Sequence, residues 1–417
     1  MRHRLRKIRG RDLGHLRSAA PERKLQGEKK RTVDTLASPS VANTVTATKR
    51  AIPTPALLLA MLRVSNRVSD LILSPGSSPH VELSGQLVPV KIPALQVLAP
   101  EDTRRISVEL IGSNKQAITA LQEQGACDIS YSIPGQCRFR VNIFMQRGSH
   151  AIVMRVIPTG IPTFAELKLP PQLAEIASLR NGIVLVTGPT GSGKSSTMAA
   201  ILDKINETQA YHIITIEDPI EFLHGHKRSI IHQRELHSDT PSFALALRAA
   251  LRQAPKVILV GEMRDRETIE IALEAAETGH LVLSTLHTID ASKTIERIVG
   301  VFPLTEQSII RNRLGKSFRY IVSQRLIPRK DGGGRIAGIE ILKSTLRTRE
   351  YVERGEEEGK TLLDAMRDGD TEGMQHFDGE IEKLIRAGTI DLGTGLAYAT
   401  NPGNLGLQLA DLSEEGT

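Results

Sequence analysis

The 417-residue chain contains no tryptophan, and its aromatic content is only 3%. Proteins that move along single-stranded nucleic acid stack bases on aromatic side chains, so this scarcity weighs against a nucleic-acid translocase. Cysteine is equally scarce. Cys127 and Cys137 are too few and too widely spaced for a zinc-knuckle type of metal site, and we expect both to be structural thiols rather than a disulfide.

Long hydrophobic runs are also missing. The longest, residues 56–62, falls far short of the roughly 20 apolar residues that span a bilayer. It also lies too deep in the chain for a secretory signal and leads into Arg63 rather than a small-residue cleavage site. We therefore expect a cytoplasmic protein, and its length predicts two or three folded units.

The net charge of +7 is concentrated at one end of the chain. Residues 1–50 hold fourteen lysines and arginines against four acidic residues, a surplus of +10, so the remainder carries −3. We expect this basic segment to be a solvated, disordered extension. Contact with nucleic acid or with an anionic membrane surface is the alternative.

The most informative stretch, residues 188–195, reads GPTGSGKS and matches the phosphate-cradling pattern G-x-x-x-x-G-K-[ST] at every required position. A β-branched apolar run, 183–187, precedes it, and apolar residues recur at helical spacing after it. This strand-to-helix context favours a nucleotide site over a glycine-rich turn without a ligand. We expect Lys194 to reach the terminal phosphates and Ser195 to bind Mg²⁺. The predicted nucleotide-binding residues are Gly188, Pro189, Thr190, Gly191, Ser192, Gly193, Lys194, Ser195 and Ser196.

Beyond residue 167, short apolar segments alternate with helical stretches, which is typical of an α/β fold with a parallel sheet covered on both faces. Ligands bind such sheets outside the carboxyl ends of the strands. The four predicted strands are 183–187, 213–216, 257–260 and 281–284.

Polar residues follow each of these strands, as hydrolysis of a nucleotide would require. Glu262 is placed to hold Mg²⁺ through water, and Glu221 is our preferred water-activating carboxylate, with Glu217 and Asp218 as support or alternatives. His287 is expected to sense the terminal phosphate. No N-K-x-D signature for guanine is present, which favours ATP.

The segment before the phosphate loop predicts a small α+β unit. Its expected helices and strands lie at 57–62, 69–74, 81–90 (a hairpin with its bend near Ser84 and Gly85), 105–122, 128–133 and 138–144. The prolines that follow suggest a stiff linker. The predicted organisation is a basic extension (1–50), an N-terminal domain (51–157), a linker (158–166), a nucleotide domain (167–345) and a helical C-terminal region (346–417).

Four motifs carry a family resemblance that spans about residues 55–405: GPTGSGKSS, ITIEDPIEF, VILVGEMRDRET and LSTLHTIDASKTIERI. With them the chain resembles the twitching-motility ATPases of type IV pili, the PilT/PilU family of the secretion-ATPase superfamily. The resemblance implies a RecA-like ATPase domain behind a PAS-like N-terminal domain, in a homo-hexameric ring that works at the inner membrane on a pilus platform protein. It also implies that Arg138, Arg140 and Arg155 complete the nucleotide site of the neighbouring subunit.

Two features of the sequence bear on the direction in which the motor works. The retraction ATPases usually carry a motif of the form AIRNLIRE, whereas residues 346–356 here read LRTREYVERGE, closer to the accessory paralogue PilU. The cysteine-rich metal insert of the pilus-extension and type II secretion relatives is missing. The resemblance thus implies a pilus-retraction ATPase, with a PilU-like accessory or regulatory subunit of another pilus motor as the alternative and a secretion or nucleic-acid translocating ATPase as a weaker one.

Overall fold

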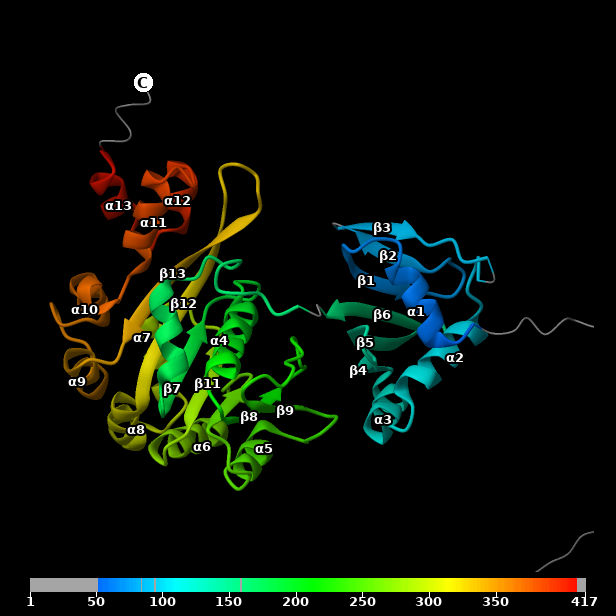
Figure 1. The fold of residues 1–417 in the computed structure, drawn as a ribbon, viewed down its shortest axis with the longest axis horizontal. Helices are drawn as coiled ribbons and strands as arrows, with labels where there is room; N and C mark the ends of the chain where they lie inside the picture. The colour runs from blue at the N-terminus through cyan, green and yellow to red at the C-terminus, as the bar shows by residue number, and fades with distance from the viewer. Residues whose placement is uncertain (1–51, 84, 94, 158–159, 411–417) are drawn as a thin grey trace, which may run out of the picture. The chain divides into compact units, whose positions relative to one another are not determined.

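The computed structural model describes residues 52–83, 85–93, 95–157 and 160–410 (Figure 1). The basic segment 1–50, Ser84 of the predicted hairpin bend, and the first two residues of the predicted linker lie outside these ranges. The described residues form two sheets, one before and one after residues 158–159, and each is described by itself.

The N-terminal sheet is antiparallel, with strand order β3-β2-β1-β6-β5-β4. Helices α1 (Thr54–Leu62), α2 (Pro100–Ile111) and α3 (Lys115–Gln124) pack with it around one apolar core, in which Phe139, Leu71 and Ile106 are fully buried. This confirms the predicted α+β unit. The strands are β1 (Val68–Leu73), β2 (His80–Leu83), β3 (Gln86–Pro89), β4 (Ala126–Ile133), β5 (Cys137–Gln146) and β6 (Ser149–Ile157).

The single helix predicted over residues 105–122 is wrong, because the chain forms two helices there. Gly112 ends α2 with a backbone φ of 55°, in the left-handed region that glycine adopts without strain. Asn114 then caps α3 by accepting a hydrogen bond from the Ala117 amide at 3.0 Å. Cys127 and Cys137 are free and buried, as predicted, and burial raises the pKa of both thiols.

The second sheet has seven strands in the order β13-β12-β7-β11-β10-β8-β9. The four predicted strands are present as β7, β8, β10 and β11, and they pair in parallel. Sequence reasoning missed β9, β12 and β13, the last of which is antiparallel to β12. The strands are β7 (Gly182–Thr187), β8 (His212–Glu217), β9 (Ile230–Glu235), β10 (Val257–Val260), β11 (Leu281–Leu286), β12 (Phe318–Pro328) and β13 (Arg335–Lys343).

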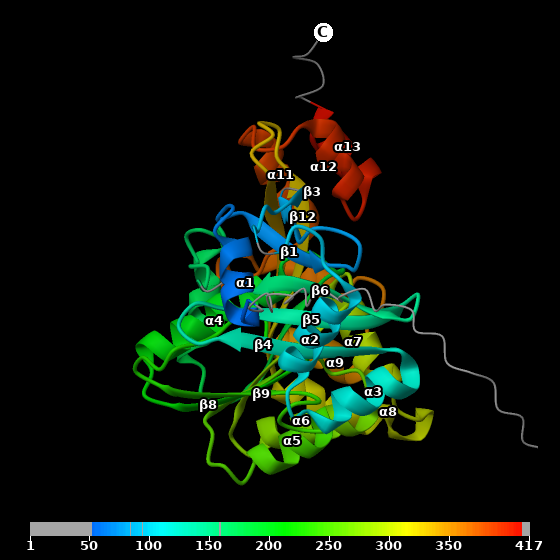
Figure 2. The same cartoon turned by 90° about the vertical axis from the view of Figure 1, so that its right-hand side faces the viewer.

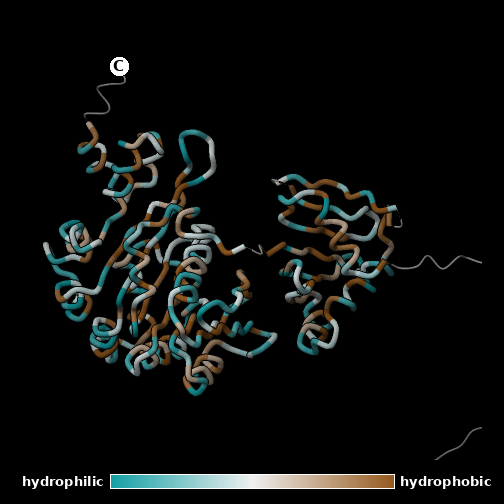
Figure 3. The backbone as a smooth tube through the Cα atoms, in the orientation of Figure 1, coloured by the Kyte–Doolittle hydropathy of each residue, from teal (hydrophilic) through white to brown (hydrophobic). Residues whose placement is uncertain are grey.

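Strand β7 shows why both faces of this sheet are covered. Ile183 and Leu185 point into the core beneath α5–α8, whereas Val184 and Val186 point into the core beneath α4 and the short helix η1. All four side chains are buried. Figure 3 colours hydrophobic residues such as these brown. The covering helices are η1 (Pro171–Ser178), α4 (Lys194–Thr208), α5 (Phe243–Ala250), α6 (Arg266–Glu277), α7 (Ala291–Gly300) and α8 (Leu304–Ser317).

The C-terminal region is helical, as predicted, and part of it packs on the outer strands: α11 contacts β13 and α12 contacts β12 (Figure 2). Arg325 of β12 fastens this contact, because its guanidinium lies 3.8 Å from the Phe377 ring and donates a 2.6 Å hydrogen bond to the Tyr398 carbonyl. None of the helices in the described ranges has the length and apolar character needed to cross a bilayer. The helices are α9 (Leu346–Arg354), α10 (Leu362–Asp368), α11 (Phe377–Arg386), α12 (Leu392–Tyr398) and α13 (Pro402–Gln408), with a single 3-10 turn, η2 (Asp370–Glu372).

Glu340 of β13 is a buried carboxyl inside this structure. It accepts a 2.9 Å hydrogen bond from the Ala291 amide at the start of α7. Burial nevertheless raises its pKa to about 7, with the nearby Asp290 charge acting in the same direction. The folded protein therefore holds this proton more tightly than the unfolded chain does.

Stability should consequently fall as the pH rises from below 4.5 through about 7, by up to about 3 kcal/mol from this one carboxyl. Glu340→Gln removes that dependence, so the variant should gain in melting temperature relative to the parent as the pH is raised from about 5 to about 8. Thermal melts of both proteins across this pH range provide the measurement. A difference that stays constant with pH would contradict the burial argument.

Candidate nucleotide-binding site

The phosphate loop joins β7 to α4, and its shape depends on glycine. Gly188, Gly191 and Gly193 have backbone φ angles of 142°, 77° and 91°. A Cβ at Gly188 would lie 2.3 Å from the backbone oxygen of Gln324, and one at Gly193 would lie 2.8 Å from the Gln324 Nε2. Any other residue at Gly188 would therefore have to displace the backbone of β12, whereas at Gly193 it would have to displace the Gln324 side chain and adopt a strained positive φ.

Lys194 sits inside the loop. Its ammonium donates to the Gly188 carbonyl at 2.9 Å and to the Pro189 carbonyl at 3.0 Å, although the side chain is almost fully buried. Burial lowers the pKa of Lys194, and the charges of Glu262 and Glu221 partly oppose that shift. An ammonium held this way is poised to bind the terminal phosphates, whose charge would stabilise its protonated form.

The hydroxyl of Ser192 gives a test of whether the loop fits an anion. It is buried, and among the described residues it has no hydrogen-bond partner. A buried hydroxyl without a partner is costly, and a bound phosphate oxygen would satisfy it. Together with the N-terminus of α4 and Lys194, this orphaned donor fits a polyphosphate.

His287 and Glu262 come together beside the lysine. The Nδ1 atom of His287 lies 3.4 Å from Lys194 Nζ, and its Nε2 atom lies 3.4 Å from Glu262 Oε2. An imidazole with its hydrogen on Nε2 can therefore accept from the lysine and donate to the carboxylate at the same time. Arg264, which sequence reasoning did not single out, pairs with the same carboxylate at 2.6 Å. The structure thus brings together three of the predicted residues from three strand ends.

The carboxylates at the end of β8 and just after it divide into two kinds. Glu217, the last residue of β8, is half-buried, accepts a 2.6 Å hydrogen bond from the Thr215 hydroxyl and another at 3.1 Å from the Gln233 amide, and burial raises its pKa. Asp218 and Glu221 are exposed. Glu217 is therefore engaged with the protein, which leaves Glu221 and Asp218 as the carboxylates that can meet a substrate or its water.

One cavity at this edge of the sheet is lined by Lys194, His287, Glu262, Arg264 and the three carboxylates of the β8 end. Phe222, Phe243 and Met198 add apolar surface to it. His224 also lines it, and burial lowers the pKa of this histidine to about 4, so its ring is neutral near pH 7. Its buried Nδ1 has no partner among the described residues. Sequence reasoning missed His224, although it lies three residues after Glu221. Among the residues predicted in the phosphate loop and at the strand ends, those that line the cavity are Pro189, Thr190, Gly191, Lys194, Ser195, Glu217, Asp218, Glu221, Glu262 and His287.

The oxygen-bearing side chains of the cavity also fit one mode of Mg²⁺ binding, in which the protein supplies only one or two ligands. No cluster of three or more His, Cys, Asp and Glu side chains in the described ranges is arranged to hold a metal by protein groups alone. Magnesium at nucleotide sites keeps several waters and binds phosphate oxygens with one or two protein ligands. Ser195 and Glu262, which both line the cavity, are sufficient for that mode.

The three predicted arginines lie together in the N-terminal sheet. Arg140 of β5 stands directly opposite Arg155 of β6, and Arg138 is two residues away on the same face of β5. Asp70 pairs with Arg155 at 3.1 Å. Their proposed action on a neighbouring subunit stays a prediction.

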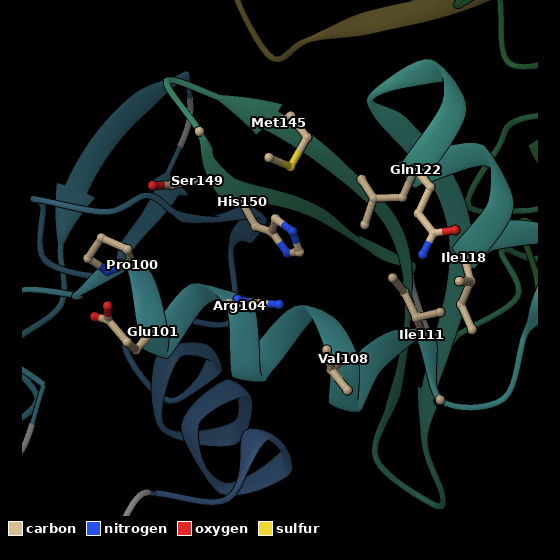
Figure 4. A pocket seen from close by; sticks show the side chains of 13 residues that line it. Pro100, Glu101, Arg104, Val108, Ile111, Ile118, Gln122, Met145, Ser149 and His150 are labelled. Atoms are coloured by element: carbon tan, nitrogen blue, oxygen red, sulfur yellow. The ribbon is translucent and has the colours of Figure 1, made fainter. Parts of the chain in front are cut away.

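Figure 4 shows a further cavity, formed by α2, α3 and the β5–β6 turn of the N-terminal sheet. Its walls are largely apolar, with Val108, Ile118 and Met145 among the lining residues. Arg104 and His150 lie on one side, and burial followed by the Arg104 charge lowers the pKa of His150.

Comparisons with known proteins point to one family. The family model described as Type II/IV secretion system protein matches residues 63–372. The chain is 42% identical over 336 residues to the Type IV pilus retractation ATPase PilT of Pseudomonas aeruginosa, covering 81% of this chain and 95% of the relative. It is 40% identical over 352 residues to the Type IV pilus ATPase PilU of the same organism, covering 84% and 90%. The crystal structure of the pilus retraction motor PilT with bound ADP matches with a TM-score of 0.75 at 42% identity, covering 84% of this chain and 97% of that one.

The phosphate loop, the parallel sheet and the polar groups at its carboxyl edge define a P-loop nucleotide hydrolase. Because the family model and the relatives cover most of the chain, the assignment can be made more specific. The chain belongs to the PilT/PilU family of type II/IV secretion-system ATPases.

Lys194→Ala should reduce ATP turnover by at least about 100-fold, because it removes the cation that meets the terminal phosphates. The fold should persist, since the hydrogen bonds of the ammonium go to the Gly188 and Pro189 carbonyls of the loop itself. Phosphate release measured on the purified variant tests this, with circular dichroism as the control for folding. Turnover near the parental rate would remove Lys194 from the site.

Proposed function

We propose that this protein is a hexameric ATPase that couples ATP hydrolysis to the retraction of type IV pili. The observation that carries the proposal is the convergence of Lys194, His287 and Glu262 within one cavity, in a chain that spans nearly the full length of a PilT relative. The match to a retraction motor that holds ADP supports the choice of an adenine nucleotide.

In the proposed site each residue has one task. Lys194 and the loop amides bind the phosphates, while Glu221 orients and deprotonates the attacking water. His287, between Lys194 and Glu262, responds to the presence of the terminal phosphate. Ser195, and Glu262 through water, would hold Mg²⁺, which neutralises charge on the phosphate oxygens when bound.

The proposed domain organisation follows the two sheets. We place an N-terminal domain at 51–157, a linker at 158–166, the ATPase domain at 167–345 and a helical C-terminal region at 346–417. In a ring, the N-terminal domain of one subunit would present Arg138, Arg140 and Arg155 to the nucleotide of its neighbour. The proposed location is cytoplasmic and peripheral to the inner membrane, against the pilus platform protein, where the basic segment 1–50 could add affinity for an anionic surface.

Mixing two inactive variants tests action in trans. Arg140→Ala and Lys194→Ala proteins should each hydrolyse ATP poorly, yet mixed rings should regain part of the activity. The mixed rings contain sites in which the intact phosphate loop of an Arg140→Ala subunit faces the intact Arg140 of a neighbouring Lys194→Ala subunit. Phosphate release from rings assembled from both proteins is the measurement.

The matched control mixes Lys194→Ala with Glu221→Gln, because both changes fall on the same subunit's share of the site and no regain is expected. Mixed rings of the arginine and lysine variants that stay as inactive as this control would contradict the trans arrangement.

A PilU-like accessory subunit is the second candidate, and the segment 346–356 together with the 40% identity to PilU favours it. Pilus retraction in a strain that lacks every paralogous pilus ATPase separates the two. We expect this protein, as the sole motor, to restore retraction. Restoration only when a second pilus ATPase is supplied would assign the accessory role instead.

A further inference from the structure

The segment that carries Glu221 connects β8 to the edge strand β9. These two strands pair in parallel, with Thr215 opposite Gln233 and Glu217 opposite Glu235. Gln233 and Glu235 are two residues apart and thus project from the same face of β9. The edge strand is therefore placed to hold the connecting segment from the side.

The Gln233 carboxamide makes three hydrogen bonds, all to that segment or to the residue before it. Its Nε2 donates to the Phe222 carbonyl at 2.8 Å and to Glu217 Oε1 at 3.1 Å, while its Oε1 accepts from the His224 amide at 2.8 Å. One carboxamide offers two hydrogens to donate and one oxygen that accepts. The three hydrogen bonds of Gln233 use both hydrogens and the oxygen.

The backbone on both sides of Glu221 is fixed as a result. The Ile220 amide donates to Glu235 Oε2 at 3.0 Å. The Glu221 amide lies close enough to the half-buried Glu217 carboxylate to favour its charged form. Gln233 then holds the carbonyl that immediately follows Glu221. The Glu221 side chain is exposed, whereas His224 is half-buried, and both residues line the nucleotide cavity.

We propose that Gln233 is a positioning residue for ATP hydrolysis, which sets the place of the Glu221 carboxylate and of the His224 ring relative to the bound nucleotide. The inference rests on the proposed role of Glu221 as the water-activating carboxylate. Gln233 does not itself line the cavity, so its effect passes through the Phe222 carbonyl, the His224 amide and Glu217.

Gln233→Met keeps the length of the side chain and removes all three hydrogen bonds. It should lower kcat by about 30- to 100-fold, because a displacement of a catalytic group by about 1 Å can cost a factor of that size. The KM for ATP and the affinity for ADP should change by less than about threefold, since the phosphate loop is untouched. A kcat within about threefold of the parent, or an equal loss in nucleotide affinity, would overturn the proposal.

Gln307→Met is the matched control. Gln307 on α8 is also half-buried and also donates through its amide to a main-chain oxygen, that of Phe302 at 3.0 Å, and neither residue lines the cavity. The Gln307→Met variant should lose about as much thermal stability as Gln233→Met and should keep the parental kcat. An equal fall in kcat for both variants would mean that Gln233 acts through stability alone.

Gln233→Glu provides a second variant of the same size. It retains the acceptor for the His224 amide but loses both donated hydrogen bonds, so kcat should fall as it does in Gln233→Met. Parental kcat in this variant would show that the bonds to Phe222 and Glu217 do not position the site, and the proposal would fail.

Glu221→Gln, assayed in parallel, separates this proposal from the one it rests on. Loss of turnover in Glu221→Gln together with full turnover in the Gln233 variants overturns the positioning role alone. Parental turnover in Glu221→Gln removes the role of Glu221 itself. The expected result is loss in both, with nucleotide affinity preserved in both.

Discussion

The site depends on the parallel hydrogen bonding of four buried strands. Strands β7, β11, β10 and β8 are neighbours in register, so the residues that follow them arrive at one edge of the sheet although they are far apart in sequence. The energy that holds this register is the burial of apolar side chains on both faces, not any contact within the site. Polar groups can therefore remain exposed at the edge, ready to bind a ligand, without having to hold the sheet together.

Two sets of hydrogen-bonding side chains next to the sheet fix the backbone of the site. Around the phosphate loop, Gln324 of β12 lies against Gly188 and Gly193 and accepts a 2.8 Å hydrogen bond from Thr197 of α4. Around the acidic segment, Gln233 and Glu217 do the same for the backbone beside Glu221. In both places an amide or carboxyl that is buried or half-buried forms hydrogen bonds with neighbouring groups, which restricts the positions of the side chains that we propose to be catalytic.

The phosphate loop and the central strands could be predicted from the sequence because each is encoded by a short continuous segment. The phosphate loop is a contiguous motif with a strand before it and a helix after it, and the four central strands are short β-branched runs bounded by polar residues. The strands β9 and β12 escaped prediction because they mix polar and apolar residues, and the partnership of Gln324 with Thr197 joins residues 127 positions apart. Arg264 and His224 were missed since their significance comes from a carboxylate and a cavity that only the folded chain assembles. The break at Gly112 was missed because the apolar residues on either side of it continue in a pattern compatible with one helix.

The central claim is that polar groups from separate strand ends act together to hydrolyse ATP rather than merely to bind it. The most direct test compares ATP affinity with the single-turnover rate of hydrolysis in Glu262→Gln, which changes one oxygen of one side chain. The account predicts affinity within about threefold of the parent and hydrolysis slower by about 100-fold or more. A variant that hydrolyses ATP at the parental rate, or one whose slow hydrolysis is explained entirely by lost affinity, would contradict it.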